Sequence, residues 1–167
     1  ELKKIEEKFI PFLKEMERTN TALRIGTNQG SLSDRVMSRY GDTPSGMSES
    51  VMEYLRICKK ANFKNAVVAV KSSNTRMMVY TVRLLNYKMR LEEMLYPFHL
   101  GVTEAGEGED GRIKSAVGIG ALLADGIGDT IRVSLTENPV NEIPVAQKLI
   151  NHFKSYINHE PITANLF

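Results

Sequence analysis

The fold of this chain is decided by the stretch Asn65-Ala-Val-Val-Ala-Val70, which runs directly into Lys71-Ser-Ser-Asn74. An uninterrupted apolar run of this kind is typical of a strand that is covered on both faces, as in a parallel sheet. The stretch from Asn74 to Met94 then carries helical spacing, at Met78, Val82, Leu85 and Met89. Strand and helix together form one βα unit.

The residues upstream repeat this unit. Thr21-Ala-Leu-Arg-Ile25 predicts a strand that ends in Gly26 and leads into a long polar loop. Thr43 and Pro44 are typical of an N-cap and a first helical position, and we expect their helix to reach about residue 61. Before this unit, residues 1–17 are expected to form an amphipathic helix, because apolar residues recur there at helical spacing.

Two further units follow downstream. Strands are predicted over residues 97–102 and 130–134, and helices over residues 111–124 and from Pro144 onward. The last helix is expected to bury Val145, Leu149, Phe153 and Tyr156.

Four successive βα units predict an α/β fold with parallel strands and right-handed crossovers. A closed (β/α)8 TIM barrel needs about 250 residues. The 167 residues of this chain therefore correspond to half of a barrel, four βα units preceded by a helix. We expect this half-barrel over residues 1–157 and a linker or tail over residues 158–167, which show no periodicity. An open doubly wound sheet is the alternative, and periodicity alone does not separate the two.

The composition argues against several classes of protein. The chain has 22 Lys and Arg residues against 20 Asp and Glu residues, a net charge of +2, so we expect no nucleic-acid partner. No apolar run approaches the roughly 20 residues of a membrane span, and residues 1–8 lack the apolar segment of a signal peptide. We therefore expect a cytoplasmic protein without a membrane partner. The single cysteine, Cys58, excludes a metal or iron–sulfur site with several thiolates from this chain.

Polar residues follow each predicted strand. Because the carboxyl ends of parallel strands meet at one face, we expect the four polar clusters to lie together there. Side-chain alternation places Arg24, Gly26 and Asn28 on one side of their strand. The clusters are residues 24–28, 71–74, 103–106 and 132–136.

Three cations and one carboxylate are expected to converge at this face: Arg24, Lys71, Arg132 and Glu104. Such an array repels itself unless an anion is bound, and guanidinium groups with hydroxyl donors suit phosphate oxygens. The sequence therefore predicts a site for a phosphorylated ligand. Two other interpretations stay open: Lys71 as the Schiff-base lysine of a phosphosugar lyase or aldolase, and a non-catalytic half-barrel that assembles with another.

Residues 106–111 match the dinucleotide-binding pattern G-x-G-x-x-G between a strand and a helix. We do not assign this function, because Glu107, Glu109 and Asp110 would face the pyrophosphate. His99 is expected to be buried near the barrel wall, and Cys58 to be a small core residue.

Four long motifs resemble a known family, the hydroxymethylbutenyl diphosphate synthases, which are iron–sulfur enzymes of the methylerythritol phosphate route to isoprenoids. The motifs occupy residues 22–44, 99–106, 108–116 and 126–136, and the similarity runs from about Leu2 to Val145. Four motifs in the right order are far more specific than any short pattern.

The resemblance implies a longer oxidoreductase that converts 2-C-methyl-D-erythritol 2,4-cyclodiphosphate to 4-hydroxy-3-methylbut-2-enyl diphosphate. Its N-terminal barrel would bind the cyclic diphosphate, and this chain would be strands five to eight. A C-terminal domain would hold a 4Fe-4S cluster, whose ligands lie outside this chain. The Gly108-Glu-Asp-Gly-Arg112 form of the third loop resembles the larger, plant-like and chlamydia-like type.

The resemblance further implies ferredoxin or flavodoxin as electron donor, a homodimer, and an inactive fragment when this chain stands alone. It places Glu104 near the reacting carbons, as the catalytic residue that delivers a proton or holds a hydroxyl. Gln29 stands where the family usually has His, and Thr27 where it usually has Val, so no histidine-dependent role is expected at that loop. The implied substrate-binding residues are Arg24, Asn28, Lys71, Thr103, Arg132 and Ser134.

Overall fold

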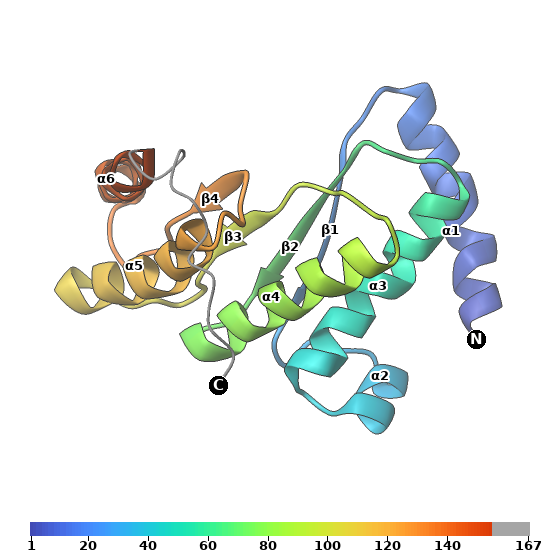
Figure 1. The fold of residues 1–167 in the computed structure, drawn as a ribbon, viewed down its shortest axis with the longest axis horizontal. Helices are drawn as coiled ribbons and strands as arrows, with labels where there is room; N and C mark the ends of the chain where they lie inside the picture. The colour runs from blue at the N-terminus through green and yellow to red at the C-terminus, as the bar shows by residue number, and fades with distance from the viewer. Residues whose placement is uncertain (155–167) are drawn as a thin grey trace.

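A computed structural model describes residues 1–154, in which strands and helices alternate along the chain (Figure 1). The strands are β1 (Leu23–Asn28), β2 (Ala66–Lys71), β3 (His99–Gly101) and β4 (Thr130–Arg132). The helices are α1 (Leu2–Arg18), α2 (Asp34–Tyr40), α3 (Pro44–Lys60), α4 (Thr75–Leu91), α5 (Gly108–Ala124) and α6 (Glu142–Lys154), with a 3-10 turn η1 (Pro139–Asn141) before α6. The predicted domain end at residue 157 lies outside the described residues.

The four strands are parallel and lie side by side in chain order. β1 pairs with β2 from Leu23–Ala66 to Asn28–Lys71, and β3 pairs with β4 from His99–Thr130 to Gly101–Arg132. Two single bridges, Val68–Phe98 and Ser72–Val102, join β2 to β3. Both bridges keep the same offset, so Lys71 lies beside Gly101 across the junction. An α/β fold with parallel strands is therefore confirmed.

The helices α3, α4 and α5 follow one another along the same side of these strands (Figure 1). Each packs on the next, α3 on α4 and α4 on α5. Between helices and strands lies one hydrophobic core, which includes Val68 and Val70 of β2, Leu100 of β3, and Leu55 and Leu85 of the helices. A doubly wound sheet has helices on both faces, whereas helices that neighbour one another in chain order are typical of a barrel wall.

Capping residues lie at the predicted starts of α3 and α4 and at the predicted end of α5. Thr43 Oγ1 accepts the Gly46 N–H at 3.2 Å, and Asn74 Oδ1 accepts the Met77 N–H at 3.1 Å. Each such cap contributes about 1 kcal/mol by satisfying a backbone donor that the first turn leaves free. Past the end of α5, Gly126 adopts φ 71°, the left-handed conformation expected of a residue that terminates a helix.

Two predicted features of the helices are corrected by the structure. The polar stretch after β1 is not all loop, because it contains α2, whose one buried residue is Val36. α5 begins at Gly108 rather than Gly111, with Glu109 and Asp110 in its first turn, where the helix dipole favours carboxylates.

The predicted burial of α6 is also wrong. No residue of α6 is buried, and Val145 and Leu149 are only half-buried against the core. Tyr156, the last residue expected on that face, lies outside the described residues. Over residues 1–154, no helix combines the length and apolar character needed to cross a membrane.

Candidate functional site

Most polar side chains of the strands lie on the face opposite the helices, in rows that run across the strands. This arrangement follows from the register, since paired residues of neighbouring strands point to the same side of a sheet. At the carboxyl ends, one row runs across all four strands and consists of Asn28, Lys71, Gly101 and Arg132. The row below it consists of Gly26, Ala69, His99 and Thr130.

Two glycines in these rows allow neighbouring groups to come close to the strands. A Cβ on Gly26 would lie 2.7 Å from the carbonyl oxygen of Ala69, so no side chain fits there without a shift. A Cβ on Gly101 would lie 3.5 Å from Lys71 Cε and 3.0 Å from the carbonyl oxygen of Arg132. The Lys71 side chain therefore extends sideways across β3, over the position that Gly101 leaves open.

A cavity of about 740 Å³ opens over this face. It extends past β1 to Phe9 of α1 and Tyr54 of α3. The structure therefore brings most of the predicted site residues around one space, namely Arg24, Asn28, Lys71, Thr103 and Arg132.

Two predicted site residues do not line this cavity. Glu104 lies exposed in the loop after β3 and adopts φ 53°, a left-handed conformation that is uncommon for a residue with a side chain. Ser134 is half-buried beyond the end of β4. The cations thus converge without the carboxylate that was expected among them.

The three cations are not used in salt bridges within residues 1–154. Every ion pair in that range joins other residues, and Arg35–Glu53 is the pair that borders the cavity. Because that pair is neutral as a whole, it leaves the positive charges of Arg24, Lys71 and Arg132 uncompensated. In the described part of the chain these cations therefore do not serve as structural ion pairs.

The convergence of the three cations affects the pKa of Lys71. Lys71 is only 8% exposed, and its burial lowers the pKa of the ammonium below the usual 10.5. The positive charges of Arg24 and Arg132 lower that pKa further. A group that is buried beside two like charges favours its neutral form, and a bound anion would remove this effect. The site is therefore arranged to gain stability from an anion.

His99, which lies on the same side of the sheet as the cations without lining the cavity, was not predicted as a site residue from the sequence. Its Nδ1 lies 2.8 Å from Thr130 Oγ1, and its Nε2 is buried without a hydrogen-bond partner in the described residues. Burial, and then the charges of Lys71, Arg24 and Arg132, lower the pKa of the imidazole. The signal was present in the sequence, because His99 alternates with Gly101 on one side of its strand.

Hydrogen bonds tie the ends of β1 and β2 together. The Gln29 N–H donates to the Lys71 carbonyl at 3.1 Å, and Ser72 Oγ donates to Gln29 Oε1. The Asn74 N–H in turn donates to Ser72 Oγ at 2.9 Å. These bonds hold Asn28 and Lys71 side by side at the carboxyl ends of their strands.

A second set of bonds explains why residues 106–111 are not a phosphate loop. The Gly108 N–H, which a phosphate would require, donates to Glu137 Oε1 at 2.8 Å. Arg112 also binds Glu137, at 2.5 Å, and its guanidinium together with the Gly108 N–H lowers the pKa of that carboxyl to about 2. Glu137 therefore occupies the start of α5 as an internal anion.

The described residues do not fit an iron–sulfur cluster. Cys58 is fully buried in the core, and burial raises the pKa of its thiol to about 11, so the thiolate that ligates iron is disfavoured. Across residues 1–154, no three His, Cys, Asp or Glu side chains are grouped to hold a metal ion.

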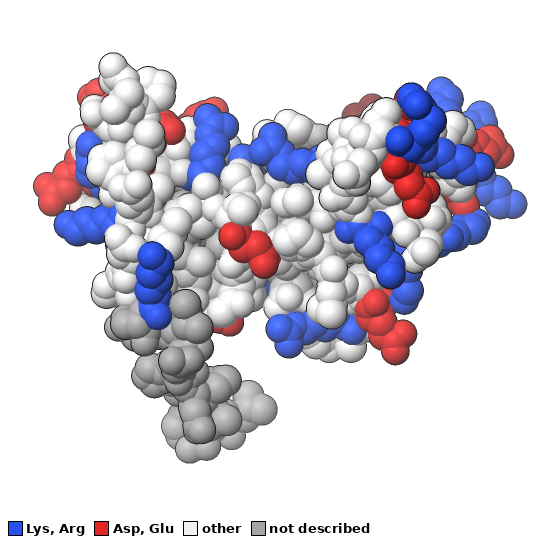
Figure 2. All heavy atoms as spheres, turned by 90° about the horizontal axis from the view of Figure 1, so that it is seen from above, with Lys and Arg blue, Asp and Glu red and all other residues white. Residues whose placement is uncertain are grey.

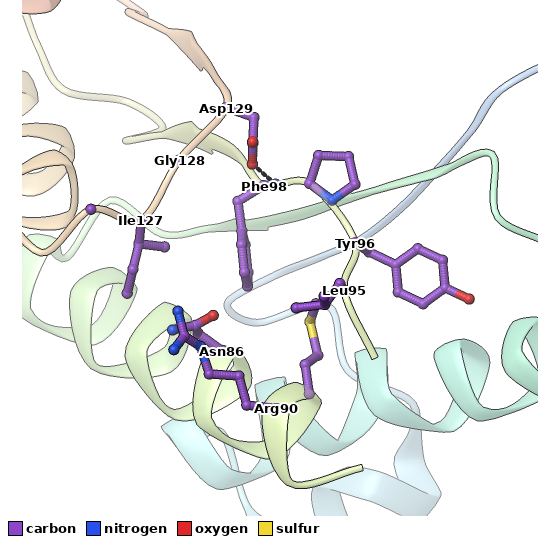
Figure 3. A pocket seen from close by; sticks show the side chains of 11 residues that line it. Asn86, Arg90, Leu95, Tyr96, Phe98, Ile127, Gly128 and Asp129 are labelled. Atoms are coloured by element: carbon purple, nitrogen blue, oxygen red, sulfur yellow. Dashed lines mark hydrogen bonds between the residues drawn. The ribbon is translucent and has the colours of Figure 1, made fainter. Parts of the chain in front are cut away.

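A smaller cavity, of about 400 Å³, lies at the opposite ends of the strands (Figure 3). Its lining includes Arg90, Phe98 and Asp129. Asp129 Oδ2 accepts the Phe98 N–H at 2.7 Å, so this carboxylate serves the backbone that leads into β3. None of the predicted site residues borders this cavity.

The surface charge is mixed. Figure 2 shows basic side chains dispersed over the visible face, with acidic side chains among them. The large cavity differs in that its cations Arg24, Lys71 and Arg132 have no salt-bridge partner in residues 1–154.

Comparisons with known proteins find similarity over nearly the whole chain. The family model described as GcpE TIM-barrel domain matches residues 2–147. The chain is 62% identical over 166 residues to a 4-hydroxy-3-methylbut-2-en-1-yl diphosphate synthase (flavodoxin) of Parabacteroides distasonis, covering 99% of the chain and 27% of that relative. It is 64% identical over 159 residues to the enzyme of that name from Bacteroides fragilis, covering 95% of the chain and 25% of the relative.

A more distant relative of the same name, from Protochlamydia amoebophila, is 59% identical over 156 residues, which are 93% of the chain and 24% of the relative. The chain therefore spans about a quarter of the length of the curated relatives that it matches.

Proposed function

The chain belongs to the GcpE TIM-barrel domain family, and on this premise we propose that it forms strands five to eight of a (β/α)8 barrel. Four parallel strands in chain order, with α3, α4 and α5 along one side, support this half-barrel. The polar face opposite the helices would then be the barrel interior, and the cavity would lie at its carboxyl-terminal mouth, where barrel enzymes bind their substrates.

The complete enzyme that we propose is a 4-hydroxy-3-methylbut-2-enyl diphosphate synthase, and this chain binds its substrate, 2-C-methyl-D-erythritol 2,4-cyclodiphosphate. The observation that carries this proposal is the convergence of Arg24, Lys71 and Arg132, without ion-pair partners in residues 1–154, on one cavity. Each charge-assisted hydrogen bond to a phosphate oxygen contributes about 1.5 to 3 kcal/mol. Asn28 and Thr103, which line the cavity, would add neutral hydrogen bonds, whereas Ser134 lies outside the cavity and would reach the ligand only after a shift of the segment after β4.

Glu104 is the proposed catalytic residue. Glu104 is exposed on the loop after β3 and does not itself line the cavity, but its neighbour Thr103 does, and from this loop Glu104 would deliver a proton to the substrate or hold a substrate hydroxyl. The electrons would come from a 4Fe-4S cluster whose ligands lie outside this chain, and the names of the relatives favour flavodoxin over ferredoxin as the donor. We further propose a cytoplasmic homodimer.

One observation favours a second function. A lysine whose pKa is lowered by burial and neighbouring cations is suited to Schiff-base formation, and Lys71 has this environment. A phosphosugar lyase or aldolase would then use Lys71 as its nucleophile. Treatment with borohydride in the presence of a phosphosugar distinguishes the two functions, since an imine leaves a reduced adduct on Lys71 and simple anion binding leaves none.

The test of the proposed function is Arg132→Ala in the complete enzyme. We expect this variant to bind the cyclic diphosphate about 10²-fold more weakly, because one charge-assisted contact is lost. The matched control is Arg90→Ala, which removes the same charge from an exposed position next to the smaller cavity. Isothermal titration calorimetry measures both, and equal affinities of Arg132→Ala and wild type would argue against the proposal.

A further inference from the structure

The most informative unexplained atom in the described residues is Nε2 of His99. It is buried and has no hydrogen-bond partner there, although buried polar atoms are nearly always bonded. We propose that His99 is a positioning residue, whose Nε2 accepts a hydrogen bond from the Lys71 ammonium in the diphosphate-bound enzyme and so aims Lys71 at the diphosphate. This inference rests on the proposed function and adds to it a group that does not itself touch the substrate.

The first step concerns the orientation of the imidazole ring. Its Nδ1 is held 2.8 Å from Thr130 Oγ1, the paired residue on β4. The other ring nitrogen consequently has a fixed direction, and it is the nitrogen without a partner. A hydroxyl is able either to donate or to accept, so this bond alone permits both neutral tautomers.

The second step decides between these tautomers. The charged groups that act on His99 are Lys71 of β2, Arg24 of β1 and Arg132 of β4. All three carry only N–H donors, so a lone pair on Nε2 is able to accept from one of them, whereas an N–H on Nε2 is not. The proposal therefore requires the neutral ring with its proton on Nδ1, donated to Thr130, which leaves Nε2 as the acceptor.

The third step places the Lys71 side chain above this acceptor. Gly101 is two residues beyond His99, on the same side of β3, and has no side chain of its own. Lys71 Cε lies 3.5 Å from the position that a Gly101 Cβ would occupy, so the end of this side chain lies over β3. Lys71 itself makes no salt bridge within residues 1–154. Nε2 of His99 thus requires a hydrogen-bond donor, and the Lys71 ammonium requires an acceptor.

The experiment is a double-mutant cycle in the complete enzyme, with inorganic diphosphate as the probe and calorimetry as the measurement. We expect His99→Leu to weaken binding about tenfold, equivalent to one neutral-to-charged hydrogen bond. His99→Gln should bind within about threefold of wild type, because its Oε1 places an acceptor near the position of Nε2. In the Lys71→Met background, His99→Leu should have no further effect, since the positioned group is already absent.

The inference is overturned if His99→Leu weakens binding equally in both backgrounds, or if His99→Gln is as weak as His99→Leu. If Arg132→Ala loses diphosphate binding but the effects of His99→Leu and Lys71→Met simply add, the proposed function stands and this inference is overturned. A wild-type enzyme that does not bind diphosphate would overturn both.

A measurement on the wild type keeps the test independent of variant folding. Nitrogen-15 NMR of the His99 ring in the diphosphate-bound enzyme distinguishes the two neutral tautomers directly. We expect Nδ1 to be protonated and Nε2 to be unprotonated at neutral pH, and a protonated Nε2 would overturn the inference.

Discussion

At the scale of single residues, Lys71 has the least ordinary environment in the candidate site. It is 8% exposed, and burial together with Arg24 and Arg132 lowers the pKa of its ammonium below 10.5. A bound diphosphate would reverse the contribution of the neighbouring charges and raise this pKa again. Anion binding and protonation of Lys71 are consequently coupled.

We therefore predict a pH dependence of binding to the complete enzyme. As the pH rises through the lowered pKa of free Lys71, affinity for the cyclic diphosphate falls, and in that range binding takes up protons. Calorimetry in buffers of different ionisation enthalpy measures this uptake. Lys71→Arg is the control, because its guanidinium stays charged and should abolish the uptake. Unchanged proton uptake in Lys71→Arg would assign the linkage to another group.

The cationic part of the site was predictable from residue types at the strand ends, whereas the positions of Glu104, Ser134 and His99 were not. Glu104 lies in a loop and has φ 53°, and no periodicity specifies the path of such a backbone. His99 alternates correctly with Gly101, but one strand alone does not reveal which of its sides faces a cavity. The side is known only from the register of the strands, which puts His99 on the same side of the sheet as Lys71 and Arg132.

At the scale of elements, the packing of α5 on β3 depends on a glycine. A Cβ on Gly118 would lie 2.5 Å from Val102 Cγ2 and 3.0 Å from Met78 Cε. The methionine is flexible, but the valine is 1% exposed and β-branched, so it has little freedom to move. Close contact between helix and strand therefore requires the absence of a side chain at this position.

We predict that Gly118→Ala destabilises α5. Overpacking costs about 1–3 kcal/mol, which exceeds the gain of up to about 1 kcal/mol in helix propensity. Hydrogen exchange should show that the free energy of opening of the α5 amides falls by about 1 kcal/mol. Val117→Ala, at a neighbouring position that is 54% exposed, is the control and should change exchange little. Slower exchange in Gly118→Ala would mean that helix propensity outweighs packing.

The helices with the strongest sequence patterns are the ones that were predicted correctly. α3 and α4 each carry a long apolar stripe and an N-cap, Thr43 or Asn74, and both were located correctly. α2 was missed because it is short and buries only Val36, too little for a periodic pattern. The burial of α6 was overestimated because spacing indicates an apolar side of a helix but not what covers it.

At the scale of the whole molecule, the sheet has two unpaired edges within residues 1–154. β1 pairs only with β2, and β4 only with β3. Beyond β4, Val140 is 67% exposed and Ile143 is 57% exposed. Unpaired strand edges and exposed apolar side chains favour association with another chain or segment.

We predict that this chain, expressed by itself, self-associates, and that sedimentation velocity shows dimers or larger species whose fraction grows with concentration. The complete enzyme is the comparison, because the first half of the proposed barrel would cover both edges. A stable, folded monomer of the chain would contradict the half-barrel and would favour an open sheet that needs no second half.

The most direct test of the central claim is a crystal structure of the complete enzyme with bound 2-C-methyl-D-erythritol 2,4-cyclodiphosphate. We predict phosphate oxygens within hydrogen-bond distance, about 3 Å, of Arg24, Lys71 and Arg132 together. A diphosphate bound elsewhere, with these three side chains paired to protein carboxylates, would contradict the claim that they converge to hold it.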